Sequence, residues 1–139
     1  MNGGGNTRSH RDIGNDGEDI AVEYLESKNY SVIARNYYAG HAEIDIIALD
    51  PDGDTVVFCE VKARAESVAE KYGRPASAVG RTKQKNLIYA ANNYIKMHPR
   101  ECRGRRVRID VIEIYLPKDG IPKVRHLRCA VTAKSGFNV

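Results

Sequence analysis

The sequence contains no tryptophan, only two phenylalanines and only three cysteines among its 139 residues. Without large aromatic side chains, the core of the folded chain must be built mainly from Val, Ile, Leu, Ala and Tyr. Cys59, Cys102 and Cys129 are odd in number, far apart and outside any CxxC spacing. This pattern argues against disulfides and against a zinc site, and it favours a reducing, cytoplasmic compartment.

Long apolar runs are also missing. No segment approaches the roughly 20 consecutive apolar residues that a bilayer-spanning helix needs. The N-terminal stretch MNGGGNTRSH lacks the apolar segment of a signal peptide. We therefore expect residues 1–11 to form a flexible lead-in, and we expect a cytoplasmic protein with no membrane partner.

What the sequence does contain is the composition of one globular domain, with 42% hydrophobic and 29% charged residues. Its net charge of +4 is unevenly distributed. Residues 1–80 contain 8 Lys and Arg against 14 Asp and Glu, whereas residues 81–139 contain 14 against 4. An acidic half joined to a basic half favours a polyanionic partner, together with something for the carboxylates to hold.

Hydrophobic periodicity predicts two helices and five strands in a single domain spanning residues 12–131, followed by a frayed tail at 132–139. The first helix is expected at 12–28, and the second is expected to be capped by Thr82 and to end near Met97. The strands are expected at 30–38, 42–49, 55–62, 107–116 and 123–131, with a loop at 63–80 and a basic connection at 100–106. Because short turns join the first three strands, we expect an antiparallel meander within an α/β fold of order αβββαβ(β).

Two neighbouring strands carry charges inside otherwise apolar runs. Alternation places Glu60 and Lys62 on one face of the third strand, and it places Glu43, Asp45, Ile47 and Leu49 on one face of the second. Glu60 and Lys62 alone are equally compatible with the solvated edge of an amphipathic strand, where an ion pair contributes at most about 1 kcal/mol. Asp45 in the adjacent strand favours a site, because clustered carboxylates are usually compensated by a divalent metal.

An ordered set of short motifs carries a family resemblance. The matching segments are residues 14–18, 35–36, 43–48, 57–62, 73–75, 83–84 and 108–111. A helix bearing Glu18, an acid in the second strand and Glu-x-Lys in the third resemble the PD-(D/E)xK nuclease superfamily. More narrowly, the chain resembles the YraN-like family of uncharacterised small bacterial proteins, which are similar to Holliday-junction resolvases. Ala42, Ala63 and Ile109 replace the usual Gly, Thr and Phe, and none of these departures removes a charged group.

The resemblance implies a restriction-endonuclease-like αβββαβ core, a central mixed β-sheet flanked by helices. It further implies metal-dependent hydrolysis of DNA phosphodiester bonds, including those of branched or damaged DNA. By the same analogy the protein would form a homodimer, since a junction has two strands to cut.

The resemblance also implies a role for each site residue. Asp45 and Glu60 would be direct ligands of Mg²⁺ or Mn²⁺, and Glu18 would bind the metal directly or through water. Lys62 would position or activate the attacking water and stabilise charge on the phosphate. Gln84 would orient the water or contact the scissile phosphate.

Basic residues supply the expected contacts to nucleic acid. They gather at the start of the second helix and before the fourth strand, as Arg81, Lys83, Lys85, Arg103, Arg105 and Arg106. Such phosphate contacts give sequence-independent, salt-sensitive binding, and no known base-reading motif is present. Tyr37, Tyr38 and Tyr72 could stack on bases or pack in the core.

Less specific interpretations stay open at this point. A carboxylate such as Glu18 is favoured in the first turns of any helix, Gln84 could be an ordinary surface residue, and the arginines could form a solvated loop. For the whole chain, the alternatives are a non-catalytic nucleic-acid-binding module on a nuclease scaffold, and a protein-interaction domain in which the arginines play no part.

Overall fold

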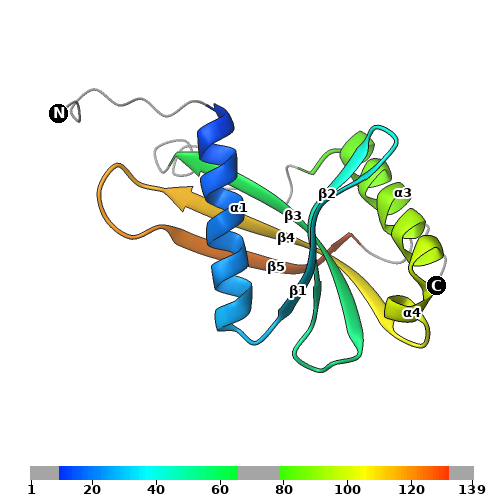
Figure 1. The fold of residues 1–139 in the computed structure, drawn as a ribbon. Helices are drawn as coiled ribbons and strands as arrows, with labels where there is room; N and C mark the ends of the chain where they lie inside the picture. Colours follow the sequence, from blue (N-terminus) through cyan, green and yellow to red (C-terminus); the bar gives the residue numbers. More distant parts are fainter. Residues whose placement is uncertain (1–9, 66–78, 132–139) are drawn as a thin grey trace.

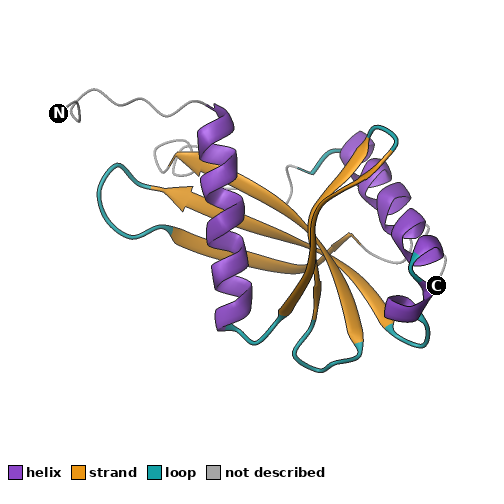
Figure 2. Ribbon diagram, in the orientation of Figure 1, coloured by secondary structure: helices purple, strands orange, loops and turns teal. Residues whose placement is uncertain are grey.

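The computed structural model describes residues 10–65 and 79–131 (Figure 1). Its elements are α1 (His10–Ser27), β1 (Ser31–Ala39), β2 (Ala42–Leu49), β3 (Thr55–Ala65), α3 (Arg81–Met97), α4 (Pro99–Cys102), β4 (Arg106–Leu116) and β5 (Lys123–Val131). The strands form one sheet in the order β1-β2-β3-β4-β5, in which only the β3–β4 pair is parallel. Helices α1 and α3 flank this sheet (Figure 2). The predicted α/β class, meander and mixed sheet are confirmed, and the architecture agrees with a restriction-endonuclease-like core.

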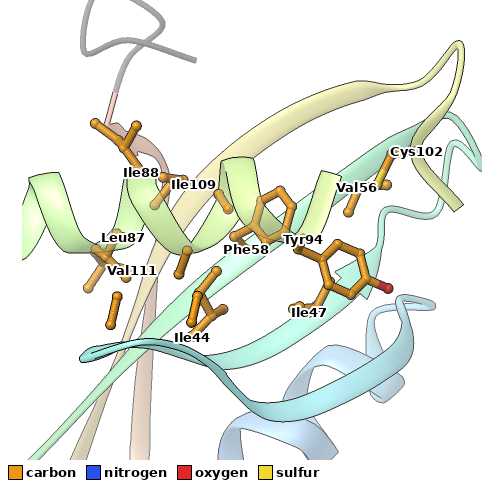
Figure 3. Packing of buried hydrophobic residues seen from close by; sticks show 14 of the residues in the cluster. Ile44, Ile47, Val56, Phe58, Leu87, Ile88, Tyr94, Cys102, Ile109 and Val111 are labelled. Carbon is orange, nitrogen blue, oxygen red and sulfur yellow. The ribbon is translucent and has the colours of Figure 1, made fainter. Parts of the chain in front are cut away.

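Apolar side chains form two clusters on opposite faces of the sheet. On the α3 side, Phe58 and Tyr94 meet with their ring centroids 5.8 Å apart, and aliphatic residues surround them (Figure 3). On the α1 side, Leu25 packs with Ile46 and Ile112 in a cluster that contains no phenylalanine. The core is therefore built largely from aliphatic side chains and tyrosine, as the composition predicts.

The predicted and observed boundaries differ most at two places. Helix α1 begins at His10, so the last two residues of the expected lead-in are helical. Strand β3 continues to Ala65 rather than ending at 62, because its parallel pairing with β4 continues as far as Ala65 opposite Leu116. Residues 66–78 of the expected loop, and with them Tyr72, lie outside the described residues, as do residues 1–9 and the tail at 132–139.

The start of α3 and the connection after it also differ. The N-cap of α3 is Gly80, and no side chain caps the helix. Thr82 lies inside the first turn, so the prediction that it caps the helix is wrong. The expected basic connection at 100–106 contains most of α4 and the first residue of β4. Within residues 10–65 and 79–131, no helix is long and apolar enough to span a membrane.

Candidate active site

The sheet forks between β2 and β3. These strands pair from Leu49 opposite Val56 as far as Ile46 opposite Cys59, and the residues of β2 before Ile46 pair only with β1. Figure 1 shows the β1–β2 hairpin leaning toward α3, while β3 runs on beneath α1. Asp45 immediately precedes Ile46 in the chain and Glu60 immediately follows Cys59, so both lie where the strands separate.

The fork changes which side chains share a face of β2. Strict alternation predicted that Asp45, Ile47 and Leu49 lie on one face. In the structure Ile44 and Ile47 both belong to the α3-side cluster, whereas Ile46 belongs to the α1-side cluster. The alternation therefore slips by one residue at Asp45. The predicted shared face of Ile47 and Leu49 is confirmed, whereas the predicted shared face of Ile44 and Ile46 is wrong, because β2 bends where it leaves β3.

The two carboxylates at the fork differ in burial and in partners: Glu60 is buried, whereas Asp45 is half-buried. Asp45 Oδ2 accepts a hydrogen bond of 2.8 Å from the Val61 N–H. Glu60 Oε2 lies 3.2 Å from Lys83 Nζ, and buried Glu60 Oε1 has no hydrogen-bond partner among the described residues. Burial, reinforced by the Glu60 charge, raises the pKa of Asp45 to about 8 against the opposing Val61 hydrogen bond. A bound cation would relieve this repulsion.

Glu18 reaches the same acidic region from α1. The helix approaches β3 so closely that a Cβ on Gly17 would lie 2.5 Å from Ala63 Cβ. Burial raises the pKa of Glu18, the nearby Arg35 opposes the shift, and the Glu43 charge adds to it. Because the charge of Glu18 also raises the pKa of Asp45, the acids share one electrostatic field. The contact at Gly17 thus brings the third predicted acid into electrostatic range of Asp45.

Lys62 and Gln84 flank the fork in different ways. Lys62 is partly buried on β3, two residues beyond Glu60 and on the same side of the strand. The Gln84 side-chain Nε2 donates a hydrogen bond of 2.8 Å to the Val79 carbonyl. Its amide therefore anchors the entry to α3, and its predicted contact with water or phosphate stays a prediction.

One buried acid near Lys62 was missed by the sequence interpretation. Glu113 of β4 is fully buried and lies opposite Lys62 in the parallel register. Tyr115 Oη donates a 3.0 Å hydrogen bond to Glu113 Oε1, and Oε2 has no partner within the described part of the chain. Alternation within the predicted strand 107–116 could have identified it, because Glu113 shares a face with Ile109 and Val111.

The predicted nucleic-acid contacts do not form a single patch. Lys83 contacts Glu60, while Arg81 and Lys85 are exposed near the start of α3. Arg105 donates to the carbonyls of Glu101 (2.8 Å) and Gly53 (3.3 Å), so it braces a turn.

Arg103 and Arg106 are exposed at the opposite end of the sheet from the fork. Arg106 pairs with Thr55, five residues before Glu60, which corresponds to about 16 Å along a strand. The basic residues therefore divide: Lys83 contacts the Glu60 carboxylate at the fork, whereas Arg106 lies at the start of β3.

Two of the three candidate tyrosines can be placed. Tyr37 packs edge-on against Tyr94 at 5.1 Å and donates a hydrogen bond to Asn93, so it is a core residue. Tyr38 is 64% exposed and hydrogen-bonded to Glu43, and the charges of Glu18 and Asp45 also act on its pKa. Of these two tyrosines, Tyr38 is the one whose ring is exposed to solvent, so only it could stack on a base.

Comparison with known proteins identifies the family. The model of the uncharacterised protein family UPF0102 matches residues 17–114. The chain belongs to this family. A UPF0102 protein of Caldicellulosiruptor saccharolyticus is 37% identical over 76% of this chain and 84% of its own length. The relative from Arthrobacter sp. is 40% identical over 84% and 92%, and the one from Chlorobium chlorochromatii is 42% identical over 74% of each chain. The predicted YraN-like membership is confirmed.

The UPF0102 name states no activity, so the chemistry has to be argued from the donor atoms. No group of three His, Cys, Asp or Glu side chains in residues 10–65 and 79–131 is arranged to hold a metal. Two carboxylates are enough for Mg²⁺, which commonly keeps several waters and takes one or two carboxylates plus phosphate oxygens. Asp45 and Glu60, with the unpartnered Glu60 Oε1, fit a hard divalent cation.

Proposed function

We propose that this UPF0102 protein is a metal-dependent endonuclease that hydrolyses phosphodiester bonds of DNA, including branched or damaged DNA. One observation carries the proposal: half-buried Asp45 and buried Glu60 meet where the sheet forks, and Glu60 Oε1 has no partner among the described residues. Lys62 follows two residues later on the same side of β3. Two acids and an amine at an opening in a sheet are suited to a phosphate and its attacking water.

Each residue would contribute a separate part of the reaction. Asp45 and Glu60 would hold Mg²⁺ or Mn²⁺, and Glu18 would contribute directly or through water. When bound, the cation lowers the pKa of water and offsets negative charge on the phosphate. Lys62 would orient the water whose oxygen bonds to phosphorus as the bond to the leaving sugar oxygen breaks. Gln84, fixed through Val79, would present the other atom of its amide to that water or to the phosphate.

Two features support a nucleic-acid substrate that has unpaired bases. The basic residues lie at the fork and at the start of β3, so a polyanion crossing the fork would meet Lys83 at one place and the arginines about 16 Å away. Tyr38 is exposed beside the acids, where an unpaired base could stack on it. A second copy of the chain would provide the second cut on a junction, and sedimentation with and without junction DNA tests this part.

The catalytic proposal is tested by cleavage of single-stranded, duplex and four-way-junction DNA with Mg²⁺, Mn²⁺ or EDTA. We expect wild-type cleavage in Mg²⁺ or Mn²⁺ and none in EDTA. Asp45→Asn and Glu60→Gln should each lower the rate at least about 100-fold, because metal catalysis contributes several kcal/mol. Glu23→Gln removes an exposed carboxylate of α1 and should cleave like wild type. Equal cleavage by Glu60→Gln and wild type, or no cleavage by wild type, contradicts the proposal.

A non-catalytic nucleic-acid-binding module is the second candidate, and a specific contact favours it. The Lys83 ammonium neutralises Glu60 from 3.2 Å, as a permanent ion pair in a metal-free scaffold would. Such a module should bind DNA in a salt-dependent way that survives loss of both Glu60 and Lys62. Binding without cleavage, unchanged in Glu60→Gln and Lys62→Met, would support this alternative over the nuclease.

A further inference from the structure

A lysine contacts one of the two carboxylates that would hold the metal. Lys83 Nζ lies 3.2 Å from Glu60 Oε2, and the Lys83 side chain is 44% exposed whereas that of Glu60 is 8% exposed. Lys83 is the third residue of α3, a helix with no acidic residue in its first turn. Because a cation is disfavoured at a helix N-terminus, the ion pair with Glu60 and not the helix accounts for this lysine.

Glu18, a second acid near the fork, also lies close to a cationic side chain, that of Arg35. Arg35 of β1 lies 3.7 Å from Glu18 Oε1 and 2.9 Å from Asp19 Oδ1. Asp45 instead accepts the Val61 N–H. The predicted ligands are thus neutralised from neighbouring elements, and Glu60 Oε1 is the buried carboxylate oxygen of this cluster that has no partner in the described chain.

We propose that Lys83 is a displaceable counter-ion, which pairs with Glu60 while the metal is absent and transfers to a DNA phosphate when a divalent cation binds Glu60. The inference rests on the proposed function, since it takes Asp45 and Glu60 as the metal site. A lysine suits the role, because its ammonium is a point charge on a flexible stem with no rigid fork to lose. Its exposed stem can swing outward, whereas Glu60 stays buried in the sheet.

The displacement couples two binding events. The ammonium on Oε2 and a cation at Oε1 compete for the one negative charge of Glu60, so each lowers the affinity of the carboxylate for the other. The released ammonium then becomes available to phosphate, so metal and DNA strengthen each other's binding, and the coupling is reciprocal. A permanent structural ion pair would produce neither competition nor coupling.

Metal affinity of the full-length protein tests the competition directly. Mn²⁺ is titrated calorimetrically into wild type, Lys83→Met, Lys83→Arg and Lys96→Met. Lys96→Met removes the same charge from the exposed last turn of the same helix and does not touch Glu60. We expect Lys83→Met to bind Mn²⁺ about 3- to 5-fold more tightly, the effect of removing one partly exposed ion pair. Lys96→Met and Lys83→Arg should stay within about 2-fold of wild type.

The coupling is measured in a Lys62→Met background, so that bound DNA is not cut. Junction DNA affinity is compared with Mn²⁺ and with EDTA, with Lys83 present and with Lys83→Met. Mn²⁺ should tighten DNA binding when Lys83 is present, and this gain should shrink at least about 3-fold in Lys83→Met. Circular dichroism confirms that each variant is folded.

The outcomes separate this inference from the proposed function. If Glu60→Gln weakens Mn²⁺ binding but Lys83→Met binds no more tightly than wild type, Lys83 is not a counter-ion and the metal site stands. If wild type shows no Mn²⁺ binding that depends on Glu60, both proposals fail. If Lys83→Met binds more tightly and wild type cuts no DNA, the counter-ion inference holds while the nuclease assignment fails.

Discussion

Asp110 is the point at which the buried polar contacts on the α1 side of the sheet converge. Its carboxylate accepts hydrogen bonds from Arg108 Nε (2.9 Å) and Nη2 (3.0 Å), from His126 Nε2 (2.7 Å) and from the Cys129 N–H (3.0 Å). Arg108 also reaches Asp50, and His126 contacts Tyr24, so the network joins α1, β4, β5 and the β2–β3 turn. It lies on the opposite face from Glu60 and Lys83, which indicates a structural role.

The pH dependence of stability should report this network. Burial acts to raise the pKa of Asp110, but the hydrogen bonds from His126, Arg108 and Cys129 outweigh it, so the pKa lies below its usual value of 3.8. A lowered folded-state pKa stabilises the protein above about pH 4, and this stabilisation is lost as the pH falls through the lowered value. We expect Asp110→Asn to cost about 3–5 kcal/mol at pH 7, because it removes the buried carboxylate between Arg108 and His126 and leaves Arg108 with the charge of Asp50 alone.

Urea unfolding at pH 7, and at steps from pH 5 to pH 2, measures both effects. The Asp110→Asn variant should lose less stability than wild type over the acid steps, since it has one fewer carboxylate to protonate. Asp119→Asn, in the exposed β4–β5 turn, should match wild type throughout. An acid dependence of Asp110→Asn as steep as that of wild type is inconsistent with the network argument.

At the scale of elements, the seating of α1 on β3 decides where Glu18 lies. Gly17 allows the close approach, because a Cβ there would lie 2.5 Å from Ala63 Cβ. Alanine favours a helix interior over glycine by about 1 kcal/mol, whereas overpacking costs about 1–3 kcal/mol. We therefore expect Gly17→Ala to lower the free energy of unfolding by up to about 2 kcal/mol and to weaken Mn²⁺ binding through the displaced Glu18.

The clash partner provides the matched control for this prediction. Ala63→Gly removes the opposing methyl group, so the double variant should recover part of the stability lost in Gly17→Ala. Urea denaturation of the two single variants and the double variant gives the coupling energy. A Gly17→Ala protein more stable than wild type shows that the helix can shift without strain.

At the scale of the whole molecule, the two charged halves occupy different places. The charges of Glu60 and Glu18 in the first half both act on Asp45, while the part of the chain that the structure describes holds no group of three acids arranged for a metal. The basic second half divides, with Lys83 at the fork and the exposed arginines about 16 Å away along the sheet. The charge asymmetry therefore corresponds to a central acidic site with separated basic regions.

The separated arginines should contribute to DNA affinity and not to metal binding. Replacing exposed Arg100, Arg103 and Arg106 by Gln should reduce the slope of log Kd against log salt by up to about 3, at roughly 0.9 per phosphate contact. Arg105 is left in place because it braces the turn at Gly53. Fluorescence anisotropy with junction DNA over a salt series measures the slope, with Lys118→Gln as an exposed single-charge control. An unchanged slope places the DNA elsewhere.

The elements, the mixed α/β class and the family could be predicted from the sequence alone. These depend on local alternation and ordered short motifs, which can be recognised without knowledge of packing. The ion pair of Arg108 with Asp110 is equally local, because two residues separate them along one strand. The contact of Asp110 with His126 could not be predicted in this way, because it depends on how β5 pairs with β4.

The contacts at the fork depend on tertiary packing and could not be predicted from the sequence. The fork at Asp45 breaks the alternation that the sequence predicts, because a strand that loses one pairing partner is free to bend. Glu113 lies beside Lys62, 51 positions away in the chain, because of the register of β3 and β4. Lys83 contacts Glu60, 23 positions away, because of the way α3 packs on the sheet. Because large aromatic residues are scarce, aliphatic clusters cover both faces of the sheet, and the charged side chains at the fork lie at their edge.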